Sequence, residues 1–326
     1  MDLVDTLRKK IAVLDDGEYV LGLKAVLLHI ETAFRHLSRG QDSDDDTAFT
    51  DAIYRTNQAF EGSIKEAYRV LAKQDPDKKR PFDIENYLEQ NNIFRSRVLS
   101  QLTTYRTGWR NPSAHDYKLD FDESEAFLAI VSVSAFACLL LDQMAERLAF
   151  DKAQAEAEGQ KAALQANLQN TKNADLLVRV TELLTQFCAI HLPPSDESPK
   201  QSEVQTIGAL HGFLSSAAPT LTVQTEASLN PERPFRADLL IAEGDDRVVV
   251  ELKRRFMSRS YANSIAQVEN YLLVGGIKRA VLLFLPEIPG EMEKTESLVG
   301  GIDGKIVVLA PLGSNPFLQR TTSDGR

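Results

Sequence analysis

Two carboxylates and a lysine lie close together in the C-terminal half of the chain, in segments that have the pattern of β-strands. Asp238 belongs to the apolar segment 237–242, and Glu251 and Lys253 end the β-branched segment 247–253. Because side chains alternate along a strand, Glu251 and Lys253 share one face, which Asp238 can reach from the preceding strand. Two converging carboxylates suit Mg²⁺ or Mn²⁺, and the ammonium can orient a water or offset the charge of a phosphate. Metal-dependent phosphodiester hydrolysis uses this set of groups.

The same residues resemble the motif of the PD-(D/E)XK nuclease superfamily, over about residues 175–310. In that family an Asp on one strand and Glu-x-Lys on the next form the metal site, and Asp238, Glu251 and Lys253 match this pattern. One departure is Ala237, which stands where the motif has proline, and the superfamily tolerates this change. The resemblance implies a metal-dependent nuclease domain with DNA as substrate and Mg²⁺ or Mn²⁺ as cofactor.

Two predicted helices flank the strands, and each carries residues that the resemblance assigns to the site. Glu203 begins the helix predicted over 203–215, and it is the candidate for the acidic residue that often joins the metal ligands from the first helix. Gln267 and Tyr271 lie in the helix predicted over 260–273. Their spacing is similar to the Gln-x-x-x-Tyr element of the RecB-like branch, which supports the site from the side.

Arginines follow the strand motif closely. Arg254, Arg255 and Arg259 form, with Lys253, a cationic rim beside the proposed site, where contact with the phosphates of a nucleic acid is expected. The alternative is a solvated charge cluster. An alternative also exists for the motif itself, because a Glu-x-Lys pair on an edge strand often forms a solvent-exposed ion pair. The preceding Asp238 and the two flanking helices favour the metal site.

A second group of chemically competent residues lies near the middle of the chain, in the segment 109–117. Arg110 offers a planar, permanently charged fork for a phosphate, and His115 can accept and donate protons near neutral pH. Gly108 and Pro112 predict a break between helices, so that both side chains can point into one cleft. Because RNA carries its own nucleophile, the 2′-hydroxyl, such a pair can cleave it without a metal ion.

This Arg-Asn-x-x-x-His pattern resembles the HEPN superfamily, over about residues 1–150. The resemblance implies a metal-independent endoribonuclease whose composite site is formed by two copies across a homodimer. Arg110 and His115 would be the catalytic pair, and Asn111 the polar residue between them. The alternative is that Arg110 and His115 cap helices or hold the dimer, since many HEPN domains have lost catalysis and serve in binding.

The spacing of apolar residues predicts two domains of different class. The first half has helical periodicity throughout, which predicts an all-α, HEPN-like bundle over 1–150. Asp122 and Glu125 predict a capping box at the start of its last helix. Residues 151–174 are rich in helix formers and poor in large apolar residues, and we expect an exposed helical connector there. The order helix, three strands, helix, strand predicts a PD-(D/E)XK-like α/β sandwich with a mixed sheet over 175–326.

Composition limits the functional classes. Of the 326 residues, 43% are hydrophobic, enough for two separate cores. The net charge of −10 argues against a protein that coats nucleic acid by bulk attraction. The two cysteines, Cys138 and Cys188, lie in apolar helical patterns and predict core packing, with no zinc site. The longest uncharged stretch, 126–141, is shorter than the ~20 residues that span a bilayer, and no signal peptide is recognised. We therefore expect a cytoplasmic protein without membrane contact.

These features predict a nuclease effector that cuts DNA at a metal-dependent site and carries a second, metal-independent site for RNA. By analogy of fold, such a combination suggests defence against foreign nucleic acid. One alternative is a DNA nuclease with a single working site, whose helical domain only dimerises or senses. The other is a nucleic-acid-binding module without catalysis, which the intact Asp238, Glu251 and Lys253 disfavour.

Overall fold

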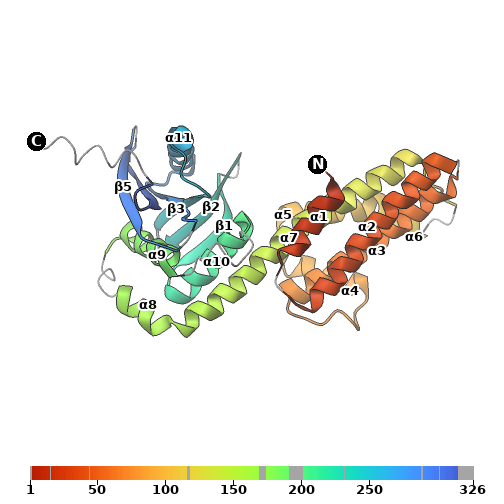
Figure 1. Cartoon of the computed structure of the whole chain (residues 1–326), viewed down its shortest axis with the longest axis horizontal. Helices are drawn as coiled ribbons and strands as arrows, with labels where there is room; N and C mark the ends of the chain where they lie inside the picture. Colours follow the sequence, from red (N-terminus) through yellow and green to blue (C-terminus); the bar gives the residue numbers. More distant parts are fainter. Residues whose placement is uncertain are drawn as a thin grey trace, which may run out of the picture. The chain divides into compact units, whose positions relative to one another are not determined.

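The chain forms two compact units, Met1–Leu148 and Ala149–Arg326, the first helical and the second built on a six-stranded sheet (Figure 1). The computed structural model describes residues 2–14, 16–43, 45–115, 118–168, 174–190, 201–230, 232–287, 289–300 and 302–314. The mixed helical and sheet composition, with the sheet in the C-terminal half, agrees with the sequence-based expectation.

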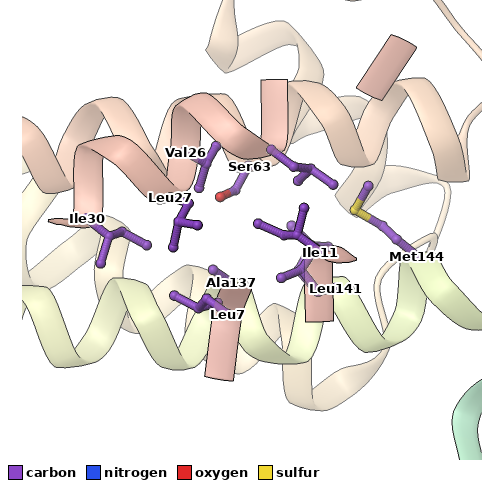
Figure 2. A pocket seen from close by; sticks show the side chains of 11 residues that line it. Leu7, Ile11, Val26, Leu27, Ile30, Ser63, Ala137, Leu141 and Met144 are labelled. Atoms are coloured by element: carbon purple, nitrogen blue, oxygen red, sulfur yellow. The ribbon is translucent and has the colours of Figure 1, made fainter. Parts of the chain in front are cut away.

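The helices of the first unit pack around one apolar core. In Figure 2, side chains of α1, α2, α3 and α7 converge on a void of about 10 Å³, which is at most the size of one water molecule. The Ser63 hydroxyl at its wall already donates to the Ala59 carbonyl at 2.7 Å, so the interior is close-packed and apolar. The elements are α1 (Leu3–Ala12), α2 (Glu18–Ser43), α3 (Thr47–Leu71), α4 (Pro81–Gln90), α5 (Ser96–Tyr105), the π-helical turn η1 (Arg106–Arg110), α6 (Asn111–His115) and α7 (Glu123–Gly159).

The predicted break at Gly108 and Pro112 is wrong. Helix α5 continues directly into η1 and α6, and the Asn111 amide donates to the Arg106 carbonyl five residues back. The wider π spacing accommodates Pro112, which has no amide hydrogen to donate. The predicted capping box of α7 is confirmed, because the Glu125 amide donates to Asp122 Oδ1 at 2.8 Å and the Asp122 amide to Glu125 Oε2 at 3.0 Å.

Helix α7 is long and apolar enough, by length and composition, to cross a membrane. The sequence did not indicate this, because the uncharged stretch 126–141 alone is too short. Half of its most apolar window is buried inside the protein. Core residues such as Ile130, Val133 and Phe136 are fully buried in the first unit. Core packing is therefore sufficient to account for the apolar character of this part of α7.

The second unit is a mixed sheet in the order β1-β2-β3-β4-β6-β5, with helices on both faces (Figure 1). Strands β3 and β4, and β4 and β6, pair in parallel, and the other neighbours are antiparallel. Helices α8, α9 and α10 share an apolar core with one face, and α11 with the other. The elements are α8 (Lys161–Leu168), α9 (Leu176–Ile190), α10 (Glu203–Ala217), β1 (Thr222–Asn230), β2 (Arg233–Glu243), β3 (Asp246–Lys253), α11 (Ser258–Gly275), β4 (Arg279–Phe284), β5 (Met292–Val299) and β6 (Gly304–Pro311).

The expectation of an exposed connector over 151–174 needs correction. Helix α7 runs on to Gly159, and α8 follows at once. Ala153, Ala157 and Leu164 are buried in the core of the second unit. The few large apolar residues suggested exposure, but small alanine side chains let helices approach closely. Residues 169–173 lie outside the described part of the chain.

Gly212 in α10 lies directly against the backbone of α7. A Cβ atom at this position would lie 2.2 Å from the Phe150 carbonyl oxygen and 3.0 Å from the Gln154 nitrogen, both backbone atoms of α7. We expect Gly212→Ala to destabilise the protein by about 3 kcal/mol or more, because backbone cannot move aside as a flexible side chain can. Urea unfolding of Gly212→Ala beside Gly159→Ala measures this, since a Cβ at Gly159 meets no atom within 4 Å. Equal stability of the two variants would contradict the packing described.

Candidate functional site

The β2–β3 hairpin places the two carboxylates side by side. Gly244 takes a left-handed conformation (φ +60°) at the turn, which a glycine adopts without strain. Residues pair in register from the turn as far as Leu239 with Val250. Asp238 and Glu251 come directly after this pair, at the end of the ladder. Strand β3 is central in the sheet and Glu251 is only 3% exposed, so the alternative of a solvent-exposed ion pair on an edge strand is wrong.

Four of the residues singled out in the sequence are joined in one hydrogen-bond network, and Asp238 lies beside it. Lys253 Nζ donates to Glu251 Oε1 at 2.8 Å and to Gln267 Oε1 at 3.0 Å. Gln267 Nε2 donates to Glu251 Oε1 at 2.9 Å and to the Tyr271 hydroxyl oxygen at 2.7 Å. Asp238 Oδ2 accepts the Leu252 amide at 2.7 Å. Helix α11 thus holds Glu251 and Lys253 from the side.

Burial and the neighbouring negative charge both disfavour the ionised form of Asp238. Burial, followed by the neighbouring Glu251, raises the pKa of Asp238 to about 7, against the lowering effect of the Leu252 amide. Glu251 Oε2 is buried and has no hydrogen-bond partner among the described residues. A buried carboxylate oxygen without a partner is costly unless a cation or a water lies beside it. The pair is therefore suited to hold a positive ion.

The donor set fits Mg²⁺ or Mn²⁺. Both ions prefer carboxylate oxygens, and Mg²⁺ is commonly held by one or two carboxylates and several waters. Asp238 uses only Oδ2 for the backbone, and Glu251 leaves Oε2 unengaged. Among the described residues, no group of three or more His, Cys, Asp or Glu side chains is arranged as a complete metal cage. Asp238 and Glu251 would therefore be the protein ligands, with the remaining positions left to water or phosphate oxygens.

Glu203, the third predicted metal ligand, lies near Asp238. It is the first residue of α10, directly after the Ser202 cap, whose capping box with Gln205 is fully formed. Its negative charge also contributes to the raised pKa of Asp238. Because this contribution requires proximity, Glu203 acts on the site through its charge, and its predicted role as a third metal ligand stays a prediction.

The three arginines of the predicted cationic rim differ in their surroundings. Arg254 Nη2 donates to the Gln201 carbonyl at 2.6 Å. Arg255 Nε lies 3.1 Å from Glu287 Oε1. Arg259 is exposed in the first turn of α11. Two of the three cations thus already contact acceptors of the chain itself.

The raised pKa of Asp238 has a consequence for stability. A carboxyl whose folded-state pKa lies above its unfolded value costs stability progressively as pH rises from about 4 to about 7, and the full cost persists at higher pH. In metal-free protein, Asp238→Asn should therefore be more stable than the wild type at pH 8, by on the order of 3 kcal/mol, and equal to it near pH 4. Thermal unfolding in EDTA across this range measures the difference. Asp245→Asn, at the exposed hairpin turn, is the control, and a pH-independent difference would contradict the burial of charge.

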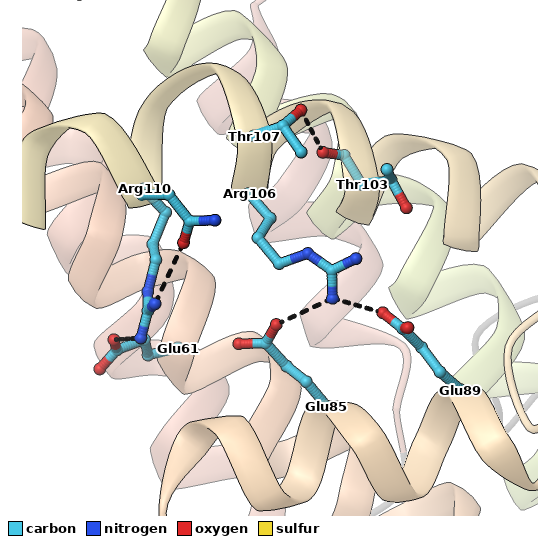
Figure 3. A network of polar contacts seen from close by, with 8 residues as sticks. Glu61, Glu85, Glu89, Thr103, Arg106, Thr107 and Arg110 are labelled. Atoms are coloured by element: carbon cyan, nitrogen blue, oxygen red, sulfur yellow. Dashed lines mark hydrogen bonds and ion pairs between the residues drawn. The ribbon is translucent and has the colours of Figure 1, made fainter. Parts of the chain in front are cut away.

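In the first unit, η1 and α6 carry the second motif. Arg110 Nη1 donates to Asn111 Oδ1 at 3.2 Å, and Nη2 lies 3.5 Å from Glu61 Oε1 of α3 (Figure 3). The guanidinium is thereby oriented from two sides. His115 is the last residue of α6, and its side chain lies outside the described part of the structure. The predicted pairing of Arg110 with His115 therefore stays a prediction.

Sequence reasoning missed a network beside this motif (Figure 3). Arg106 Nη1 donates to Glu89 Oε1 at 2.6 Å and to Glu85 Oε2 at 3.4 Å. Glu85 is 2% exposed, and burial raises its pKa although Arg106 and Arg110 oppose this shift. The signal was present in the sequence, since Arg106 and Arg110, and Glu85 and Glu89, are each four residues apart and share a helix face.

A buried polar chain also fixes the motif against α3. The Tyr105 hydroxyl shares its one proton between Thr56 Oγ1 at 2.7 Å and Asn57 Oδ1 at 2.9 Å. Asn57 Nδ2 donates to Ser113 Oγ at 2.8 Å, and Ser113 Oγ in turn donates to the Arg110 carbonyl at 3.1 Å. Tyr105 is fully buried, so its role is core packing with a satisfied hydroxyl.

Comparison with known proteins gave no relative: no family model, no curated protein and no solved structure matches this chain.

Proposed function

We propose that the second unit hydrolyses phosphodiester bonds of DNA, with Mg²⁺ or Mn²⁺ held by Asp238 and Glu251. The observation that carries the proposal is the network in which Lys253 and Gln267 meet Glu251 beside Asp238, with Glu251 Oε2 buried and unpartnered. The resemblance of Asp238, Glu251 and Lys253 to the PD-(D/E)XK motif supports it. A metal ion held there would polarise a phosphoryl oxygen and lower the pKa of a bound water.

The residues around the ion have separate tasks in this proposal. The Leu252 amide fixes the orientation of Asp238. Lys253 presents its ammonium on the same face as Glu251, where it can contact a phosphate oxygen or orient the attacking water. Gln267 accepts from Lys253 and donates to Glu251, so it fixes both side chains at once. Arg259, exposed nearby, is available to contact the nucleic-acid backbone.

Purified protein incubated with labelled DNA tests the proposal. Cleavage is expected with Mg²⁺ or Mn²⁺ and none with EDTA. Single-stranded and double-stranded DNA, and RNA of the same sequence, should be compared in the same buffer. Absence of metal-dependent cleavage from all of these substrates would refute the proposal.

We further propose that the first unit is a metal-independent endoribonuclease that works as a homodimer. The supporting observation is the π-helical turn that ends at Arg110, because π-turns are frequent at functional sites. Arg110 is oriented there by Asn111 and Glu61. The resemblance to HEPN domains adds His115 and a composite site between two copies. Light scattering checks the dimer, and a strict monomer would leave only the single-site DNA nuclease. By analogy of fold alone, either activity would suit a role in defence against foreign nucleic acid.

A further inference from the structure

One hydrogen bond joins the end of β3 to the start of α10. Arg254, the residue after Lys253, donates from Nη2 to the Gln201 carbonyl at 2.6 Å. Gln201 directly precedes Ser202, the N-cap of α10. The helical ladder begins with the Ser202 carbonyl, which accepts the Thr206 amide at 3.0 Å. The Gln201 carbonyl is therefore outside the ladder and free to accept a charge-assisted bond from the guanidinium.

The bond matters because α10 and the hairpin supply different carboxylates. Glu203 is the first residue of α10, whereas Asp238 and Glu251 lie on β2 and β3. The capping box of Ser202 and Gln205 shapes the first turn of α10. It does not set the distance of that turn from the end of β3. The apolar core that α10 shares with the sheet places the helix as a whole, and the Arg254 bond adds a direct tie between its start and the end of β3.

We propose that Arg254 is a positioning residue of the metal site. By holding the Gln201 carbonyl, it fixes the first turn of α10 so that the Glu203 carboxylate stays close to Asp238. The negative charge of Glu203 then adds to the attraction of the site for a divalent cation. This role differs from the direct phosphate contact that the sequence predicted for Arg254. The inference rests on the proposed metal site.

The neighbouring arginine provides a matched control. Arg255 is the same residue type, one position along, and it pairs with Glu287, both side chains being more than half exposed. The variant Arg255→Ala removes one positive charge from the same segment as Arg254→Ala does. It leaves the bond between Arg254 and Gln201 in place. A difference between the two alanine variants therefore isolates that bond from the general loss of positive charge.

The test measures the affinity for Mn²⁺ of the full-length protein, without nucleic acid, by electron paramagnetic resonance titration. Arg254→Ala should raise the Kd for Mn²⁺ about tenfold, the lower end of the range for supporting residues around a metal. Arg255→Ala should leave it unchanged. Arg254→Lys should recover part of the loss, because an ammonium can still donate one bond to the carbonyl. In a Glu203→Gln background, Arg254→Ala should cause no further loss, because the two residues act as one unit.

Each other outcome overturns the inference in a recognisable way. If the wild-type protein binds Mn²⁺ no better than Asp238→Ala does, the proposed metal site is refuted, and the inference with it. If Arg254→Ala binds Mn²⁺ as tightly as the wild type, the positioning role is refuted and the proposed metal site still stands. Equal losses in the wild-type and Glu203→Gln backgrounds show that Arg254 acts by some other route than Glu203. Thermal unfolding in EDTA identifies any variant that fails to fold. If Arg254→Ala does not fold, the Kd of Arg254→Lys for Mn²⁺ tests the inference, and a Kd equal to that of the wild type contradicts it.

Discussion

Replacement of Asp238 by alanine should abolish metal-dependent DNA cleavage, and replacement of Lys253 by alanine should do so while leaving metal binding largely intact. Asp238 is one of two carboxylates available to the ion, and its removal leaves Glu251 alone. Lys253 cannot be a ligand, because its ammonium group has no lone pair to offer the ion. Its loss removes the group that orients water or contacts phosphate, which we expect to cost about 10²–10⁴ in rate.

Single-turnover cleavage of labelled DNA in Mg²⁺, together with Mn²⁺ titration of the same variants, separates these two effects. Asp245→Asn serves as the control, because it changes a carboxylate of the same hairpin at the exposed turn. Wild-type cleavage by the Asp238→Ala protein would contradict the assignment of the site. Loss of Mn²⁺ binding in Lys253→Ala would show that the lysine supports the ligands rather than the reaction.

The residues of the proposed metal site in the second unit could be predicted, because local patterns determine their geometry. Alternation along β3 puts Glu251 and Lys253 on one face, and the four-residue spacing of Gln267 and Tyr271 puts them on one face of α11. The structure joins these four side chains by hydrogen bonds. The bond of Arg254 to Gln201 connects residues 53 apart in sequence. Nothing local in either segment signals it.

Elements whose burial depends on distant partners were missed. Strand β5 was not predicted, since Glu293, Lys294 and Glu296 give it a charged pattern, as is common on the edge of a sheet. The burial of Ala157 and Leu164 depends on α9 and α10, which come later in the chain. In the first unit the helices followed from periodicity. The continuous π-turn at Gly108 did not, because glycine and proline usually signal a break.

The two proposed sites differ in what their chemistry requires. Asp238 and Glu251 need a cation to act on a phosphodiester, because two carboxylates alone repel it. Arg110 carries a permanent positive charge and needs none. Arg110 is, however, close to Glu61 in the structure, at 3.5 Å. A phosphate that binds the guanidinium must therefore compete with that carboxylate.

RNA cleavage should persist in EDTA and disappear in His115→Ala. Cleavage by the 2′-hydroxyl requires proton transfer and stabilisation of a charged phosphorane, and no step requires a divalent ion. The expected loss is about 10²–10⁴ for His115→Ala. Arg110→Lys should be nearly as damaging as Arg110→Ala, because an ammonium cannot reproduce the fork that is oriented by Asn111 and Glu61.

The products and controls of this experiment identify the site that acts. A 2′,3′-cyclic phosphate at the cleaved end shows that the nucleophile came from the RNA itself, whereas hydrolysis at the metal site uses water. Arg97→Lys, an exposed arginine of α5, should cut RNA like the wild type. RNA that stays intact under all conditions, while DNA is cut with Mg²⁺, would contradict the ribonuclease proposal. The helical unit would then serve in assembly or sensing, and the proposed metal site at Asp238 and Glu251 would stand unaffected.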